Sequence, residues 1–312
     1  MYILCLKSSH VVGMGHLFRM MNLYEAIAAK GIAAVFVLLG EHAPSEDWLK
    51  SKKLKYEVID DEFGEWEAPL IRKYCPVTWI NDRLDTDERH ALKIKSHGIK
   101  LVTFDDGGGG AKHADIHVAA LTQAHQSVLR ENQLLTGLAY LILSQEISHY
   151  QHLRTSADKL VVSLGGSDTH GMTVKVVDYL AKTERPATII LGPGFMHEEA
   201  LGKVISGTIT IKRNVPSLAA EFANYDFAIT GGGITAFEAA AAGLPALNIA
   251  NEYHEIGFCK YLEELGCSVY AGYLDDADLQ KLEDMSNIQS MSMSGIEKVT
   301  LSGAENVLNK IN

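Results

Sequence analysis

The chain repeats one pattern twice: a short, continuously apolar segment of strand length is followed by a segment whose apolar residues have helical spacing. Strands that are apolar on both faces need cover on both faces, so this alternation is typical of parallel α/β sheets. In the first half the expected strands are Tyr2–Leu6, Ala33–Leu39, Tyr56–Asp60, Thr78–Asp82, Lys100–Asp106, Asp115–Ala120 and Leu138–Leu143. In the second half they are Lys159–Leu164, Ala187–Leu191, Ile209–Val215, Phe227–Thr230, Ala246–Ala250 and Val269–Ala271.

A polar, histidine-rich stretch over Gln145–Asp158 has no clear periodicity and separates the two halves. We therefore predict an N-terminal domain over residues 1–150 and a C-terminal domain over residues 151–312, the latter ending in a helix at Gly303–Ile311. A chain of 312 residues is long enough to bury two cores of ordinary domain size. The expected fold is α/β, with two doubly wound Rossmann-type domains that face a cleft.

Composition excludes several classes of function. The formal net charge is −11 and there is no cluster of Lys and Arg, so we expect no nucleic-acid partner. The four cysteines, Cys5, Cys75, Cys259 and Cys267, include no pair at metal-site or redox spacing, which favours a reducing compartment. No apolar run reaches membrane-spanning length and the N-terminus lacks a signal-peptide layout. We expect a cytoplasmic protein without membrane insertion and, in the absence of a heptad seam, a monomer.

The turn after the first strand, Gly13-Met14-Gly15-His16, is a candidate for chemistry. Open α/β sheets bind their ligands at the carboxyl ends of strands, and glycines there let backbone amides approach an anion. His16 follows them, and histidine is the side chain best suited to move a proton near neutral pH. If the motif is considered alone, the commoner interpretation is a glycine-rich turn with a surface histidine that has no catalytic role. The turn lacks both a Gly-Lys-Ser/Thr ending and a third glycine at dinucleotide spacing.

Acidic residues close two neighbouring strands of the first half. Asp82 ends the fourth, while Asp105 and Asp106 end the fifth and precede the glycines 107–110. Adjacent strand residues point to opposite faces, so Asp105 and Asp106 should not converge on one ion, and we predict no metal site. The glycine run is interpreted either as a lid or sugar-phosphate contact, or as a solvated turn.

A second glycine-rich turn, Gly231-Gly232-Gly233, precedes Ile234 and Thr235 in the second half. Free N–H groups at the start of the following helix, together with the Thr235 hydroxyl, suit a phosphate. Glu238 lies one turn into that helix. There its carboxylate would either accept hydrogen bonds from the two hydroxyls of a ribose or simply complement the positive end of the helix dipole.

An equivalent turn, Gly165-Gly166-Ser167-Asp168, follows the first strand of the second half. Gly166 and Ser167 are candidate contacts to the same diphosphate through an amide and a hydroxyl. Asp168 is expected to cap the next helix rather than to bind ligand.

Taken together, these motifs resemble a known family. The Gly-x-Gly-His turn, the Gly-Gly-Ser-Asp turn, the run Gly-Gly-Gly-Ile-Thr-Ala-Phe-Glu-Ala-Ala-Ala-Ala-Gly-Leu-Pro and the later Asn-Glu-x-His are similar to those of GT-B-type nucleotide-sugar proteins. Within that group the chain most resembles the UDP-2,4-diacetamido-2,4,6-trideoxy-β-L-altropyranose hydrolases of the pseudaminic acid pathway. The resemblance covers most of the chain.

The resemblance implies a GT-B-like fold whose second half binds UDP and whose first half faces the sugar. It implies that His16 is the base that activates water at the anomeric carbon, that Thr235 contacts phosphate and Glu238 the ribose, and that Asn251 lies near the sugar-diphosphate. Backbone amides rather than a metal would meet the diphosphate charge, and no cofactor is implied. The expected substrate-binding residues are Gly13, Gly15, Arg19, Asp82, Gly166, Ser167, Gly232, Gly233, Ile234, Thr235, Glu238 and Asn251.

One position departs from those hydrolases, which carry His-Tyr after the aspartate where this chain has Arg83-Leu84. Two alternatives therefore stay open beside a UDP-sugar hydrolase. The first is a glycosyltransferase in which His16 deprotonates an acceptor hydroxyl. The second is a non-catalytic UDP-sugar-binding protein.

Overall fold

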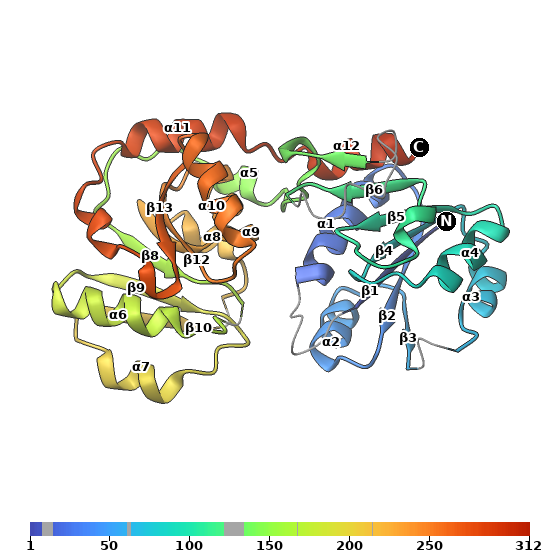
Figure 1. Ribbon diagram of the computed structural model, residues 1–312, viewed down its shortest axis with the longest axis horizontal. Helices are drawn as coiled ribbons and strands as arrows, with labels where there is room; N and C mark the ends of the chain where they lie inside the picture. Colours follow the sequence, from blue (N-terminus) through green and yellow to red (C-terminus); the bar gives the residue numbers. More distant parts are fainter. Residues whose placement is uncertain (8–14, 61–63, 122–133, 167, 214) are drawn as a thin grey trace. The chain divides into compact units, whose positions relative to one another are not determined.

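A computed structural model describes residues 1–7, 15–60, 64–121, 134–166, 168–213 and 215–312 (Figure 1). The chain divides into two compact units. The first unit comprises Met1–Leu143 together with Ser302–Asn312, and the second comprises Ser144–Leu301. Each unit is built around one parallel sheet, in agreement with the predicted fold class.

The first unit contains a seven-stranded sheet in the order β3-β2-β1-β4-β5-β6-β7. Its strands are β1 (Tyr2–Lys7), β2 (Ala34–Leu39), β3 (Tyr56–Ile59), β4 (Thr78–Asp82), β5 (Lys100–Phe104), β6 (Ile116–Ala119) and β7 (Leu134–Thr136). Its helices are α1 (Gly15–Ala29), α2 (Ala43–Ser51), α3 (Glu67–Tyr74), α4 (Glu88–Ser96), α12 (Gly303–Ile311) and the short 3₁₀ turns η1 (Ala111–His113) and η4 (Leu138–Tyr140).

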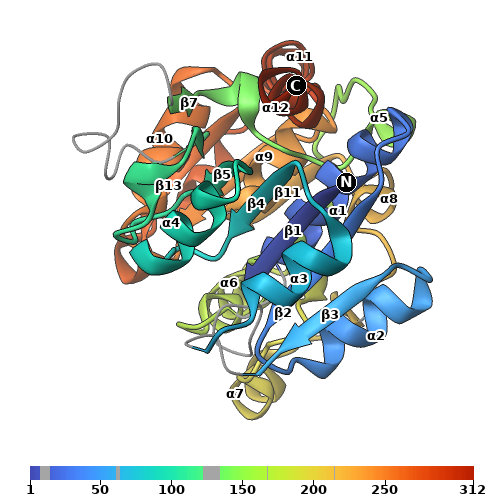
Figure 2. The same cartoon turned by 90° about the vertical axis from the view of Figure 1, so that its right-hand side faces the viewer.

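Strand β1 shows why the sheet needs helices on both faces. Leu4 and Leu6 belong to a core that includes residues of α1 and α12, while Ile3 and Cys5 belong to a second core with residues of α3 and α4. All four side chains are fully buried, as the alternation of side chains along a strand requires. Figures 1 and 2 show α1 and the α3–α4 pair on opposite sides of these strands.

The second unit contains a six-stranded sheet in the order β10-β9-β8-β11-β12-β13. Its strands are β8 (Leu160–Ser163), β9 (Ala187–Leu191), β10 (Ile209–Arg213), β11 (Phe227–Gly231), β12 (Ala246–Ala250) and β13 (Ser268–Tyr273). Its helices are α5 (Ile147–Tyr150), α6 (Met172–Lys182), α7 (Glu198–Val204), α8 (Leu218–Phe222), α9 (Ile234–Ala241), α10 (Glu255–Glu264), α11 (Ile288–Lys298) and the 3₁₀ turns η5 (Leu274–Asp276) and η6 (Leu279–Glu283).

In both sheets the strand order reverses direction at one place. The chain moves outward from β1 to β3 and then returns to place β4 beside β1, and it likewise returns from β10 to place β11 beside β8. A reversal of this kind leaves a crevice at the carboxyl ends of the two central strands, where doubly wound sheets bind ligands. A ligand is therefore expected beside the segments that follow β1, β4, β8 and β11.

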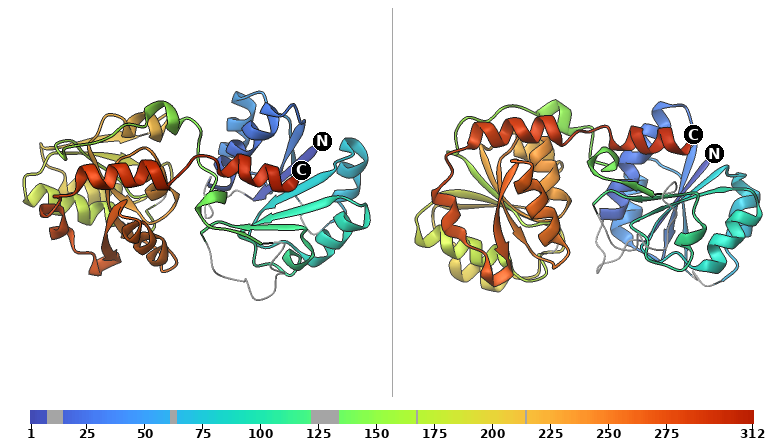
Figure 3. Two further views of the ribbon diagram at one scale, coloured as in Figure 1. Left: turned by 90° about the horizontal axis from the view of Figure 1, so that it is seen from above. Right: turned by 45° about the horizontal axis from the view of Figure 1, so that its top comes forward.

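Three details of the expected organisation were wrong. The second unit begins at Ser144 rather than at residue 151, so residues 144–150 belong to it. Leu138–Leu143 is not a strand: η4 covers its start, and the last strand of the first sheet is β7. The terminal helix α12 belongs to the first unit rather than to the second, and it packs against α1 and η4. Figure 3 shows this red helix lying with the blue and green elements of the first unit. Its apolar stripe, Val307, Leu308 and Ile311, completes that core.

The position of α12 can be tested because Trp48, Trp66 and Trp79, the three tryptophans of the chain, all lie in the first unit. Leu308→Ala opens a cavity at a fully buried site and should lower the unfolding free energy reported by tryptophan fluorescence by about 2–5 kcal/mol. Urea denaturation measures it. The matched control is Leu180→Ala, which removes an equally buried leucine from the second unit. An unchanged tryptophan transition in Leu308→Ala would contradict the assignment of α12.

Candidate functional site

In the first unit, three predicted site residues meet where β1 and β4 lie side by side. His16 and Arg19 are one turn apart on α1, and Asp82 is the last residue of β4. His16 Nδ1 lies 2.6 Å from Asp82 Oδ1. Arg19 binds the same carboxylate in a bidentate manner, with Nε 2.8 Å from Oδ2 and Nη2 2.5 Å from Oδ1. The Asp82 side chain is fully buried.

The contact with Asp82 determines which nitrogen of neutral His16 carries the proton. An ionised carboxylate only accepts hydrogen bonds, so His16 Nδ1 must donate. Arg19 Nη2 lies farther away, 3.5 Å from Nδ1, and is itself a donor. The lone pair of the neutral imidazole is therefore on Nε2, the atom that would take a proton.

Asp82 stays ionised although it is buried. Burial alone would raise the pKa of this carboxyl, but the Arg19 guanidinium and the hydrogen bond from His16 hold it below its usual value. In turn, the two carboxylates that Arg19 contacts raise its pKa against the opposing effect of burial. The first unit thus keeps a fixed negative charge behind the imidazole.

Asp105 and Asp106 point in different directions, as predicted from their neighbouring positions. Asp105 accepts a hydrogen bond from Arg19 Nη1. Asp106 is buried and accepts from the backbone N–H groups of Thr86, at 3.0 Å, and Gly108, at 2.8 Å. The participation of Asp105 in the cluster was not predicted, although its place at a strand end was the available signal.

The glycine run after Asp106 is tied to the loop that follows β4. Gly110 N donates to Thr86 O over 2.8 Å. A Cβ at position 108 would lie 2.4 Å from Thr86 O, and one at position 110 would lie 2.5 Å from Asp87 O. These glycines therefore permit close packing of two loops, which argues against the lid interpretation.

In the second unit, β11 ends at Gly231 and α9 begins at Ile234, so the predicted glycine turn is a strand-to-helix junction. A Cβ at position 232 would lie 2.6 Å from Cys259 Sγ and 2.8 Å from Glu255 Cβ. Gly232 is thus required because α10 packs directly against the turn. Thr235 is half-buried in the first turn of α9, and the Ile234 side chain is 41% exposed.

Asn251 carries a buried polar atom without a partner. Its backbone N–H donates to Glu255 Oε2 at 2.8 Å and its Nδ2 to Leu164 O at 3.2 Å. Its Oδ1 has no hydrogen-bond partner among the described residues, although the residue is only 7% exposed. A buried acceptor left unpaired is costly, so a donor from a bound ligand would stabilise this site. Glu255, which orders the Asn251 loop, was not among the predicted residues.

Glu238 is half-buried on α9, and no side chain among the described residues donates to its carboxylate. Burial raises the pKa of Glu238 to about 7. Hydroxyl donors would stabilise the ionised form of this carboxylate, because they replace the hydrogen bonds with water that burial removed.

The turn after β8 is described only in part. Gly166 has open space where a Cβ would lie, and its carbonyl accepts from Gly194 N at 2.8 Å. The Asp168 carboxylate accepts from the N–H groups of Met172, at 2.9 Å, and Thr173, at 2.8 Å, which confirms that it caps α6. Gly15 is the exposed first residue of α1. Gly13 and Ser167 lie outside the described residues.

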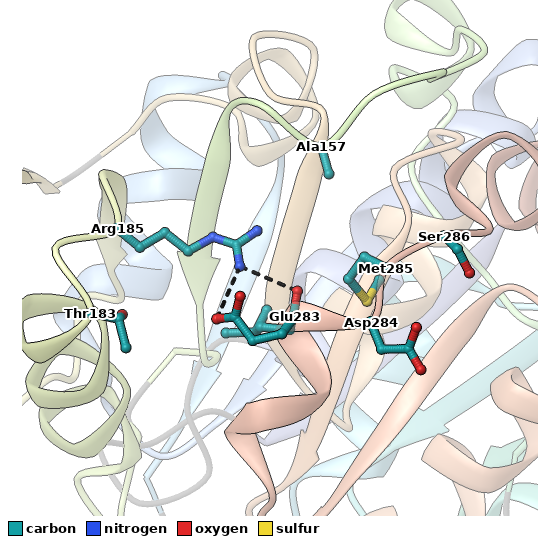
Figure 4. A pocket seen from close by; sticks show the side chains of 8 residues that line it. Ala157, Thr183, Arg185, Glu283, Asp284, Met285 and Ser286 are labelled. Carbon is teal, nitrogen blue, oxygen red and sulfur yellow. Dashed lines mark hydrogen bonds and ion pairs between the residues drawn. The ribbon is translucent and has the colours of Figure 1, made fainter.

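Three further features concern the described residues only. They contain no group of three or more His, Cys, Asp or Glu side chains arranged to hold a metal ion. None of their helices combines the length and apolarity needed to cross a membrane. A cavity of about 620 Å³ lies near Arg185 and Glu283 (Figure 4). Its lining residues Ala157 and Arg185 precede β8 and β9, so it lies at the amino-terminal ends of these strands, whereas the glycine turns follow the carboxyl ends.

No family model matches the chain. An uncharacterized protein of Methanocaldococcus jannaschii is 27% identical over 293 residues, which cover 86% of this chain but 60% of that protein. The spore coat polysaccharide biosynthesis protein SpsG of Bacillus subtilis is 23% identical over 279 residues, covering 83% of this chain and 80% of SpsG. This chain therefore spans about three fifths of the archaeal relative and four fifths of SpsG.

Solved structures establish the fold. A glycosyltransferase of Rickettsia africae aligns with a TM-score of 0.69 at 12% identity, covering 99% of this chain and 97% of that one. The GT-B-like class predicted from the sequence is therefore confirmed. At this identity the likeness shows the fold alone.

The packing of Gly232 gives a prediction that needs no ligand. Gly232→Ala should lower the unfolding free energy of the second unit by about 1–3 kcal/mol, because the new methyl overlaps Cys259 and Glu255. Gly166→Ala is the matched control, since its Cβ would enter open space. Denaturation followed by far-ultraviolet circular dichroism compares the two variants. Equal stability of both would show that the turn is not held by α10.

Proposed function

We propose that this protein hydrolyses a nucleotide sugar, releasing UDP from a UDP-2,4-diacetamido-2,4,6-trideoxyhexose by attack of water at the anomeric carbon. The observation that carries the proposal is the His16–Asp82–Arg19 cluster at the strand-order reversal of the first unit. His16 Nε2 would take the proton of the attacking water. Asp82 would stabilise the imidazolium that forms, because it is ionised and 2.6 Å from Nδ1.

The second unit would hold the nucleotide. Amide groups of the Gly231–Gly233 turn and the start of α9, with the Thr235 hydroxyl, would bind the diphosphate, whose charge suits a helix N-terminus. The Glu238 carboxylate would accept hydrogen bonds from the ribose hydroxyls. The unpaired Oδ1 of Asn251 would accept a hydrogen bond from an N–H or O–H group of the substrate.

The finer parts of the proposal come from the resemblance of the motifs. The identity of the sugar and a place in nonulosonic acid biosynthesis rest on it alone. The name of SpsG, a polysaccharide biosynthesis protein, agrees with a substrate in the activated-sugar class. We further propose a monomeric state and a cytoplasmic location, the latter in keeping with four cysteines that form no disulfide in the structure.

A glycosyltransferase on the same fold is the second candidate. Leu84, which follows Asp82 by two residues, is 43% exposed and offers no hydroxyl to place a water molecule. In a transferase, His16 would instead deprotonate an acceptor hydroxyl. A protein that only binds UDP-sugars would have no need of the His16–Asp82 pair.

His16→Asn should reduce UDP release from UDP-amino-sugars by about 10²–10⁴-fold, because the general base is lost. UDP affinity should stay nearly unchanged, since the nucleotide is assigned to the second unit. UDP release is measured with EDTA and without acceptor, and affinity by calorimetry. His97→Asn, an exposed histidine at the end of α4, is the control. Wild-type binding of UDP without release from any donor would favour the transferase, and weaker UDP binding in folded His16→Asn would contradict the base role.

Glu238 gives a pH-dependent prediction. Its pKa of about 7 in the unliganded protein should fall when ribose hydroxyls donate to the ionised carboxylate. UDP binding then releases a proton, so affinity should rise as pH increases through 7, with a limiting slope of tenfold per unit below it. Glu238→Gln should weaken UDP binding by about 1–3 kcal/mol and remove this part of the slope. Any slope left in the variant belongs to UDP itself, and identical profiles would remove Glu238 from the ribose.

A further inference from the structure

Asp105 is linked to the proposed base through Arg19. The Arg19 guanidinium lies between two carboxylates: Nε and Nη2 contact Asp82, and Nη1 donates to Asp105. One face of the guanidinium is covered by Phe104, whose ring centroid is 5.2 Å from Arg19 Cζ. Arginine has a rigid planar fork, so fixing both ends of the fork fixes its whole orientation.

The backbone at Asp105 is suited to this contact. Asp105 has a φ of +46°, in the left-handed region, which a non-glycine residue adopts at some cost in energy. Its N–H donates to Val118 O at 2.9 Å, so the end of β5 remains attached to β6 while the chain turns. Aspartate and asparagine tolerate the left-handed region better than most residues, which makes Asp105→Asn a conservative substitution.

The charges around His16 explain what Asp105 contributes. Asp82, Asp105 and Arg19 together carry one net negative charge, which an imidazolium at His16 would neutralise. Without Asp105 the remaining pair is neutral, while the positive Nη2 of Arg19 still lies 3.5 Å from Nδ1. Protonation of His16 would then be less favourable.

Other charged groups near these strand ends have different partners. Lys7, at the end of β1, and Arg83, after β4, both pair with Asp85, at 3.7 and 3.2 Å. Strand β2 carries no charged residue, and at the far end of α1 Lys30 donates to Asn309 of α12. Within the described ranges, the charge balance at His16 therefore depends chiefly on Asp82, Arg19 and Asp105.

We infer that Asp105 is a positioning residue that acts through Arg19: it holds the guanidinium against Asp82 and thereby sets how strongly His16 binds a proton. The inference rests on the proposed role of His16 as base. It extends the functional cluster from the β1–β4 junction to the end of β5.

The test uses the full chain with isotope-labelled histidine, and the His16 resonances are assigned by their loss in His16→Asn. In the unliganded protein, Asp105→Asn should move the protonation of His16 seen in these spectra to lower pH, because a negative charge beside Arg19 is lost. The acidic limb of the pH profile for UDP release should shift to lower pH by the same amount. Because Arg19 is less firmly held, kcat should fall about tenfold with a smaller change in KM. Asp105→Glu, which keeps the charge, should restore most of the His16 pKa.

Asp106→Asn is the matched control, because it removes the neighbouring carboxylate, which binds Thr86 and Gly108 instead of Arg19. An equal shift of the His16 pKa in both variants, or none in Asp105→Asn, overturns the inference. The two proposals can fail separately. A shifted His16 titration in a protein that hydrolyses no UDP-sugar supports the role of Asp105 and rejects the hydrolase. Normal hydrolysis with an unshifted titration supports the hydrolase and rejects the role of Asp105.

Discussion

The buried carboxylate of Asp82 is the constraint on which the first unit depends. An ionised group without water is strongly destabilising unless it is paired and hydrogen-bonded. Arg19 and His16 provide both, and they come from the one helix that follows β1. The same interaction therefore attaches the start of α1 to the end of β4 and orients the imidazole. Loss of Arg19 would leave the Asp82 charge buried without its ion-pair partner, and the carboxylate that orients His16 would be less firmly held.

The two units use the same topological position for different chemistry. In the first, side-chain charges of both signs meet at the carboxyl ends of the neighbouring strands β1 and β4. In the second, the carboxyl ends of β8 and β11 are followed by glycines and a helix N-terminus, and Glu238 and Asn251 Oδ1 are acceptors with no donor among the described residues. Fixed charges suit proton transfer, whereas free amides and unpaired acceptors suit the binding of a phosphorylated, hydroxyl-rich ligand.

Glycines that look alike in the sequence are required for different physical reasons in the structure. Gly108, Gly110 and Gly232 leave no space for a Cβ because neighbouring loops or helices touch their backbone, whereas Gly166 faces open space. A glycine-rich turn therefore indicates either close packing within the protein or close approach of a ligand. Only the surrounding packing distinguishes the two, and at Gly232 it is α10 that requires the glycine.

By itself, the sequence determined the parallel α/β class, most strands, the divergence of Asp105 from Asp106 and the cap at Asp168, because these follow from periodicity and local hydrogen bonding. The tertiary structure alone decided that Arg19 joins Asp82 to Asp105, residues 63 and 86 positions away in the chain. It also decided that α12 returns to the first unit and that Asn251 Oδ1 finds no donor in the part of the chain that the structure describes. These features depend on contacts between segments distant in sequence, for which a local pattern carries no signal.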